Sequence, residues 1–105
     1  MQPNVAQKNF DPELLIVGLD EVSIKRLVLR IFEFRCAICR HPAGTVHEIV
    51  PRARGKKSLT FSNRMAICND CHTEEHRVGA SPKRVVELHT IRTEYLIAIG
   101  KKSYV

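Results

Sequence analysis

Apolar residues recur at helical spacing in two stretches of the chain, one near each end. The first stretch predicts a helix over residues 20–34 that begins at Asp20, a residue type that caps helix N-termini. Its apolar positions follow the pattern i, i+3, i+4, i+7 and are Ile24, Leu27, Val28 and Ile31. A shorter helix is expected before it, over residues 11–17, and a last one over residues 82–99. The apolar stripe of this last helix consists of Val85, Leu88, Ile91, Tyr95 and Ile99. Both long helices therefore have one face suited to packing against a core.

The middle of the chain has the pattern of a short hairpin followed by a helix. Residues 44–50 are rich in β-branched side chains and end at Pro51, which favours a strand. Residues 58–61 alternate polar and apolar, which predicts a second strand, paired antiparallel with the first. A helix is expected over residues 68–77, with Gly79 just beyond its end. The chain is therefore predicted to have an α+β fold, in which a small hairpin and a helix lie between N- and C-terminal helices.

Length and composition restrict this fold to one small globular domain over residues 1–105. The chain is 44% hydrophobic and 27% charged, which is too apolar for a disordered protein. A domain of this size buries a modest core, so that a metal ion or a cross-link would add needed stability. The N-terminal residues are polar, and no apolar run approaches the roughly 18 residues of a membrane helix. We therefore expect a cytoplasmic protein without a membrane partner.

The net charge is +6, and its distribution says more than its total. Residues 35–64 contain seven basic residues and one acidic residue, whereas the segments before and after them are nearly neutral. The whole excess of positive charge therefore lies in the middle third of the chain. Such a local excess indicates a polyanionic partner such as nucleic acid.

Four cysteines stand in two Cys-x-x-Cys pairs, Cys36 with Cys39 and Cys68 with Cys71, and 28 residues lie between the pairs. Each pair can present two thiolates on one side of a turn, so that the four together can bind one tetrahedral structural zinc ion. Two disulfides, or cysteines buried as small hydrophobic residues, are the alternatives. A reducing compartment and this spacing favour zinc.

Two histidines come directly after the second cysteine pair. His72 and His76 are four residues apart and so share one face of the predicted helix, from which two imidazoles can reach one metal ion. Two histidines on a polar helix are more often solvated, so this pair gains meaning only from its neighbours. Cys71 and His72 are consecutive and point about 100° apart on a helix, which leaves room for a second ion beside the zinc.

Taken in order, these motifs resemble the HNH nucleases. The sequence runs from Cys36-x-x-Cys39 through His47-Glu48-Ile49-Val50-Pro51-Arg52 and Asn63 to Cys68-x-x-Cys71-His72-x-x-x-His76. The resemblance covers residues 36–76 and implies a ββα-metal fold, here stapled by the four-cysteine zinc. It implies one nuclease domain with an N-terminal helical segment over residues 1–34, a core over residues 35–78 and a C-terminal helix over residues 79–105. It further implies hydrolysis of DNA phosphodiester bonds with the help of a divalent cation.

The roles of family residues transfer position by position onto this sequence. The first residue of the strand pair is a metal ligand in the family and falls on His47, while the second, usually a His that acts as general base, falls on Glu48. The central Asn falls on Asn63, which would hold the loop that positions the base. The metal ligand after the second cysteine pair falls on His72, and His76 matches a further His of colicin-type nucleases. Basic residues around the strand loop would contact phosphate, and these are Arg52, Arg54, Lys56, Lys57 and Arg64.

Glu48 departs from the pattern of the family. A Glu is a weaker base than a His, because its unperturbed pKa is about 4.3 rather than about 6.5. Glu48 can serve as the base, as an anionic metal ligand with His47 as the base, or as a change that slows or inactivates the site. The identity of the catalytic cation is equally open among Mg²⁺, Mn²⁺, Ni²⁺ and Zn²⁺.

The sequence therefore predicts a metal-dependent HNH endonuclease that acts on DNA. Nothing in it resembles a base-reading helix, so little sequence specificity is expected. The alternative is a zinc-stabilised DNA-binding module that has kept the fold and lost hydrolysis. Small members of the family often occur in phages, inside a bacterial host cell, where they work beside packaging or restriction proteins. The oligomeric state stays open.

Overall fold

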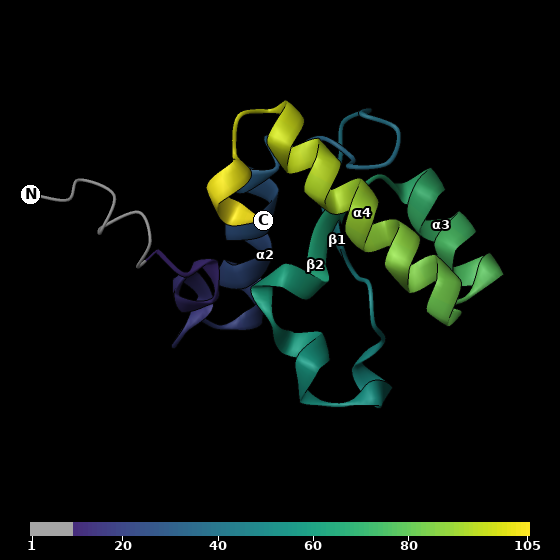
Figure 1. Ribbon diagram of the computed structural model, residues 1–105, viewed down its shortest axis with the longest axis horizontal. Coiled ribbons are helices and arrows are strands. Elements are labelled where there is room, and N and C mark those ends of the chain that lie inside the picture. Colours follow the sequence, from purple (N-terminus) through teal and green to yellow (C-terminus); the bar gives the residue numbers. More distant parts are fainter. Residues whose placement is uncertain (1–9) are drawn as a thin grey trace, which may run out of the picture.

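Three α-helices and one hairpin make up the framework of residues 10–105, the part of the chain that the computed structural model describes. The side chains of Lys56 and Lys57 lie outside that description. In chain order the elements are α2 (Glu21–Ile31), β1 (Thr45–Glu48), β2 (Arg64–Ile67), α3 (Asn69–Val78) and α4 (Pro82–Ala98). The hairpin lies at the centre, with α2 on one side, α3 on the other and α4 running across, so the fold is a small α+β fold (Figure 1). In the described residues no helix combines the length and the apolar character needed to cross a bilayer.

The first two predicted helices are present but shorter or tighter than expected. The segment Pro12–Ile16 is a 3₁₀ helix. Helix α2 begins after Asp20, whose carboxylate accepts a hydrogen bond of 2.7 Å from a backbone N–H of the first turn. It ends at Ile31 rather than at residue 34, because Glu33 and Phe34 adopt φ angles of 59° and 57° that turn the chain away. This turn leads directly into the first cysteine pair.

The hairpin uses a second strand different from the predicted one. β1 lies within the predicted segment and pairs antiparallel with β2, with Glu48 opposite Arg64. The prediction of a strand at residues 58–61 is wrong, because these residues belong to 3₁₀ turns. The true partner strand, β2, follows immediately after these turns.

Two side chains explain why residues 58–61 bend instead of extending. Phe61 is fully buried and anchors the turn in the core. The side chain of Asn63 donates a hydrogen bond of 2.9 Å to the carbonyl of Ser58, which curls the chain between them. β2 itself is buried at every position, so it lacks the alternation that marks a half-buried strand.

Helix α4 closes the core over the hairpin and spans the predicted range to within one residue. Its residues Leu88, Tyr95 and Leu96 are buried in the core. The hydroxyl of Tyr95 donates a hydrogen bond to the backbone carbonyl of Phe32, just after α2. Helix α4 thereby fixes the segment from which the first cysteine pair emerges.

Arg92 lies inside this interface, although the apolar stripe of the sequence indicated no charge there. Its Nε donates a hydrogen bond of 2.8 Å to the carbonyl of Arg64, and its guanidinium packs over the rings of Phe32 and Phe61. Burial lowers the pKa of Arg92 to about 10. The bond to Arg64 joins α4 to the start of β2 and so supports the hairpin.

Candidate functional site

The four cysteines meet at one end of the hairpin. Cys36 and Cys39 lie in the knuckle after α2, and Cys68 and Cys71 lie at the N-terminus of α3. The backbone N–H of Ala37 donates to the carbonyl of Ala66 at 3.0 Å, which holds the knuckle against β2. The four sulfur atoms all lie within 4.8 Å of one another. The predicted cysteine cluster is therefore present.

The chemistry of this cluster fits a structural metal such as zinc. Sulfurs on a tetrahedral zinc ion with bonds of about 2.3 Å are about 3.8 Å apart, and the sulfurs of Cys39 and Cys68 are 3.5 Å apart. The backbone N–H of Cys71 lowers the pKa of the Cys68 thiol, whereas burial raises the pKa of the Cys71 thiol. Four thiolates this close together need a cation to offset their charge, and a zinc ion would supply it.

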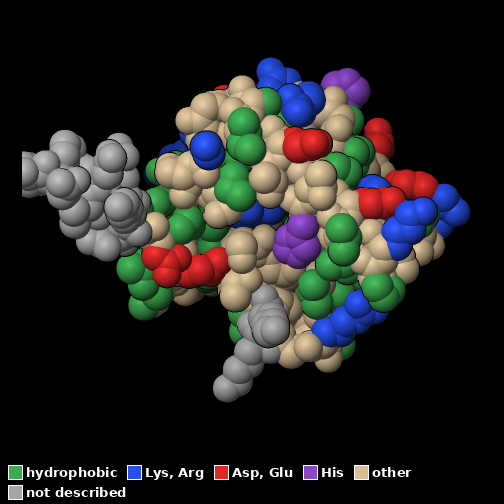
Figure 2. All heavy atoms as spheres, in the orientation of Figure 1, with side chains coloured by type: hydrophobic (Ala, Val, Ile, Leu, Met, Phe, Trp, Pro, Cys, Tyr) green, Lys and Arg blue, Asp and Glu red, His purple; other side chains and the backbone are tan. Residues whose placement is uncertain are grey.

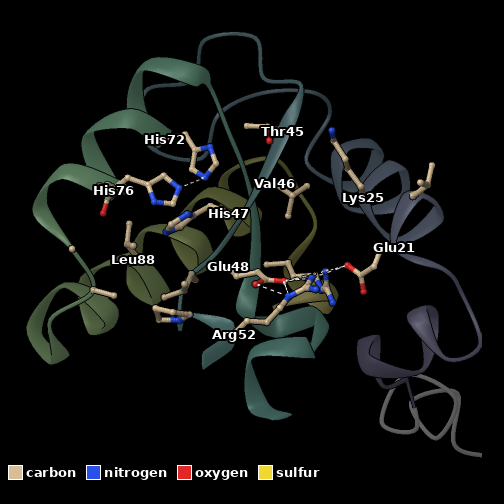
Figure 3. A pocket seen from close by; sticks show the side chains of 17 residues that line it. Glu21, Lys25, Thr45, Val46, His47, Glu48, Arg52, His72, His76 and Leu88 are labelled. Carbon is tan, nitrogen blue, oxygen red and sulfur yellow. Dashed lines mark hydrogen bonds and ion pairs between the residues drawn. The ribbon is translucent and has the colours of Figure 1, made fainter. Parts of the chain in front are cut away.

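Three imidazoles from two elements converge on the other face of α3 (Figure 3). His47 comes from β1, and His72 and His76 lie one turn apart on α3. The ring centroid of His47 is 5.3 Å from that of His72 and 6.1 Å from that of His76. The rings of His72 and His76 are 4.5 Å apart, and their Nε2 atoms are separated by 3.1 Å. The structure thus brings together the three histidines that the sequence singled out.

The histidine cluster has the donor set of a metal site. Two imidazole nitrogens bound to one ion at about 2.0–2.1 Å lie about 3.0–3.4 Å apart, which is the separation found for His72 and His76. Burial and the neighbouring His72 lower the pKa of His47 to about 4. Burial and the neighbouring His76 also lower the pKa of His72. His47 and His72 are therefore neutral at pH 7 and carry the free lone pair that a metal ligand needs.

Glu48 points away from the histidines, because neighbouring residues of a strand face opposite ways. Its carboxylate accepts hydrogen bonds from Arg52 Nε at 3.1 and 3.2 Å and from Arg52 Nη2 at 2.7 Å. Arg64, its partner across the hairpin, lies 3.7 Å away. Glu21 from α2 completes the group by binding both arginines. Glu48 is therefore the centre of an ion-pair network and not part of the histidine cluster.

A cleft of about 670 Å³ spans both of these groups. His47, His72 and His76 line one part of it, and Glu48 and Arg52 line another. Helix α2 contributes Glu21 and Lys25 on the far side of β1, as the labelled side chains in Figure 3 show. The cleft thus joins the metal-type cluster to a charged wall.

Residues 35–77 match the family model described as HNH endonuclease. We call this matched stretch the HNH segment. Its boundaries enclose both cysteine pairs, the hairpin and all of α3 except its last residue, while α2 and α4 lie outside it. No curated protein and no solved structure matches the chain.

Asn63 occupies the centre of the HNH segment and closes the loop between its strands. Its side chain accepts a hydrogen bond of 2.8 Å from the N–H of Val50 and donates one of 3.0 Å to the carbonyl of the same residue. A third bond reaches Ser58. Asn63 is 3% exposed, so these bonds form away from solvent. The loop that carries Arg52 and Arg54 is therefore held at its base.

The five basic residues expected to contact phosphate are not equally placed. Arg54 is exposed, Arg52 is paired with carboxylates, and Arg64 is buried with a side chain only 5% exposed. The side chains of Lys56 and Lys57 lie outside the described residues. On the face in Figure 2, the coloured Lys and Arg side chains are scattered, some of them beside Asp and Glu, and do not form one basic patch. Some basic side chains of the HNH segment are thus already paired with carboxylates of the protein.

Glu75 is a residue of the cleft that the sequence reasoning did not select. It lies on α3 between His72 and His76, and its side chain is 5% exposed. Arg84 of α4 binds both of its oxygens, with Nε at 2.9 Å from one of them. The available signal was its position three residues after His72, which places both on one helix face. Its negative charge opposes the lowering of the pKa of His47.

Proposed function

We propose that this protein is a metal-dependent endonuclease that hydrolyses DNA phosphodiester bonds with little sequence preference. The observation that carries the proposal is the convergence of His47, His72 and His76 in an open cleft within the HNH segment. A site with three protein ligands leaves a coordination position open for water or substrate, as catalytic metal sites do.

In this proposal the three histidines hold a divalent ion, which is Mg²⁺, Mn²⁺, Ni²⁺ or Zn²⁺. Such an ion supplies polarisation of the phosphate and a lower pKa for a bound water. Of the residues of β1, His47 lies within the histidine cluster, whereas Glu48 faces Arg52 on the other side of the strand. Arg84 holds Glu75 by both oxygens, which keeps this carboxylate in place beneath the histidine face of α3.

DNA would reach the cleft from the side of the loop that carries Arg52 and Arg54. Arg54 is exposed and, with the neighbouring lysines Lys56 and Lys57, gives the loop a charge suited to the phosphate backbone. Contacts of this kind position the duplex without reading its bases. The cysteine cluster, with its zinc, would hold the knuckle and α3 in register as a structural site.

A second candidate function is a zinc-stabilised DNA-binding module without hydrolysis. The observation that favours it is the state of Glu48, which stands where the family usually has a His. Both of its oxygens accept hydrogen bonds from Arg52, so its carboxylate is directed at a cation and away from the histidine cluster. Such a module would keep the fold and the phosphate contacts.

Supercoiled plasmid separates the two functions. The purified protein is incubated with plasmid and Mg²⁺, Mn²⁺, Ni²⁺ or Zn²⁺, and a parallel reaction contains EDTA. An endonuclease gives nicked and linear DNA that EDTA prevents, whereas a binding module retards the plasmid and leaves it intact. Loss of one metal ligand by His72→Ala is expected to lower the cleavage rate at least a hundredfold, the scale of removing one strong electrostatic contribution.

His89→Ala is the matched control, because His89 lies on α4 and does not line the cleft. It should cleave at the rate of the unchanged protein. Equal cleavage by His72→Ala and His89→Ala would remove the histidine cluster from the mechanism. Glu48→His restores the usual family residue, and a large gain in rate would show that Glu48 limits the site.

A further inference from the structure

Four charged side chains form a network across the cleft side of β1. Arg52 Nη2 lies 3.0 Å from Glu21 and 2.7 Å from Glu48, while Arg64 Nη1 lies 3.3 Å from Glu21. The network joins α2, β1, β2 and the turn after Pro51 (Figure 3). It therefore connects a helix outside the HNH segment to the loop inside it.

The backbone turn after β1 fixes the position of Arg52 in this network. Glu48 ends β1, and the chain then turns at Pro51 into the 3₁₀ helix Arg52–Arg54. Val50 lies inside this turn, and the side chain of Asn63 forms hydrogen bonds with both the backbone N–H and the backbone carbonyl of Val50. Arg52 is consequently folded back over Glu48, and the pair spans only four residues.

The two arginines of the network differ in what they can offer to a ligand. The side chain of Arg64 is 5% exposed. Its Nη1 and Nη2 donate to Glu21 and to the carbonyl of Leu59, while its buried Nε has no partner among the described residues. The side chain of Arg52 is 56% exposed. Its Nε and Nη2 bind carboxylates, whereas its Nη1 has no hydrogen-bond partner among the described residues. Arg52 therefore combines an unpaired Nη1 with a largely exposed side chain that lines the cleft.

We propose that Glu48 and Glu21 are positioning residues that hold Arg52 with its Nη1 edge toward a DNA phosphate in the cleft. Glu48 then acts on the substrate through Arg52 and does not deprotonate the attacking water. Glu21, which lies on α2 outside the HNH segment, belongs to the same substrate-binding unit. This inference rests on the proposed binding of DNA in the cleft.

The physical advantage of the arrangement is a fixed guanidinium. A free Arg side chain samples many rotamers, and binding must select one of them. Two carboxylates hold Arg52 in one orientation before the substrate arrives, so less freedom is lost when a phosphate binds. The network contains two acids and two bases and so has no net charge. It directs a phosphate to one place rather than attracting DNA over a distance.

The test compares Glu48→Gln, Glu21→Gln, Arg52→Ala and the double variant Glu48→Gln/Arg52→Ala. Plasmid cleavage gives kcat and KM, and fluorescence anisotropy gives Kd for a duplex in a His72→Ala background that does not cleave. We expect each single variant to raise KM and Kd about tenfold, the size of one weakened charged hydrogen bond. We expect the double variant to bind no more weakly than Arg52→Ala alone, because Glu48 acts through Arg52.

Two controls separate positioning from general damage. Glu94→Gln changes an exposed Glu of α4, and Arg26→Ala changes an exposed Arg of α2 that does not line the cleft. Both should bind DNA like the unchanged protein. Glu21 is 56% exposed, so Glu21→Gln should remain folded even if Glu48→Gln does not. Arg52→Lys should behave like Arg52→Ala, because an ammonium cannot bind two carboxylates and a phosphate in a planar fork.

Each result decides the inference separately from the proposed function. A fall of about a hundredfold or more in kcat for Glu48→Gln with KM unchanged identifies Glu48 as the base and overturns the inference while the nuclease stands. Unchanged KM and Kd in Glu21→Gln overturns it as well. Additive losses in the double variant do the same. If the unchanged protein never cleaves, the nuclease fails, and the Kd values still support or overturn the role of Glu48 and Glu21 in DNA binding.

Discussion

The cysteine cluster and the histidine cluster share helix α3, and they differ in what surrounds them. Cys68 and Cys71 face the knuckle, where Cys36 is fully buried and a backbone hydrogen bond ties the knuckle to β2. His72 directly follows Cys71, and both His72 and His76 face an open cleft. One short helix therefore contributes to two clusters, one of four cysteines and one of three histidines.

This difference indicates different uses for the two sites. A zinc ion with four protein ligands has no position left for substrate, so its binding energy goes into folding. A site with three imidazoles keeps a free position and therefore suits chemistry. Removing a cysteine of the first cluster should accordingly unfold the protein, whereas removing a histidine of the second cluster should leave it folded.

The largest effect is expected from Cys68→Ser. The variant should lose its zinc and its folded state, because zinc binding contributes about 10–16 kcal/mol in small zinc domains. Native mass spectrometry measures the metal, and circular dichroism measures thermal unfolding. Asp70→Asn is the control, since Asp70 is exposed and lies in the same turn. An unchanged melting temperature in Cys68→Ser would contradict a structural role for the cysteine cluster. An equally large fall in the melting temperature of His72→Ala would contradict the difference between the two clusters.

The two clusters were predictable from the sequence because their geometry is local. A Cys-x-x-Cys turn places two sulfurs together, and a spacing of four residues places His72 and His76 on one helix face. The hairpin strand that carries His47 was also readable from its β-branched residues and Pro51. The HNH pattern then joined these local features in the correct order.

The charged wall of the cleft could not be read in the same way. The ion pair of Glu21 with Arg52 joins residues 31 positions apart, and no spacing rule connects them. The basic residues around Arg52 were predicted to contact phosphate, and Arg64 was among them, whereas the fold buries Arg64. The strand at residues 58–61 was predicted from alternation, and the bonds of Asn63, which no local pattern reveals, bend that segment instead. Tertiary contacts decided each of these positions.

An intermediate effect is expected from Asn63→Ala, which acts on the histidine side of the molecule. The change leaves the N–H and carbonyl of Val50 and the carbonyl of Ser58 without their partner. We expect a loss of about 2–3 kcal/mol in the free energy of unfolding, since unsatisfied buried polar groups are costly. Zinc content should not change, because the cysteine cluster lies at the other end of the hairpin.

Urea denaturation measures this loss, and native mass spectrometry measures the zinc. Asn69→Ala is the control, because Asn69 is exposed at the start of α3. Cleavage should fall along with stability, since the loop bearing Arg52 loses its anchor. Loss of zinc in Asn63→Ala would show that the two ends of the hairpin are not independent, and the contrast between the clusters would then be weaker than the structure indicates.

The smallest effect is expected from Arg54→Ala, which tests whether DNA lies on the histidine side alone. Arg54 is exposed, so the free energy of unfolding should change by no more than about 0.5 kcal/mol. Removing one phosphate contact should weaken duplex binding and reduce the slope of log K against log salt by about 1. Anisotropy titrations at several salt concentrations measure that slope, with Arg26→Ala on α2 as the control. Equal slopes for both variants would place the DNA away from the loop, and the open histidine site would then lack the phosphate contacts that bring a substrate to it.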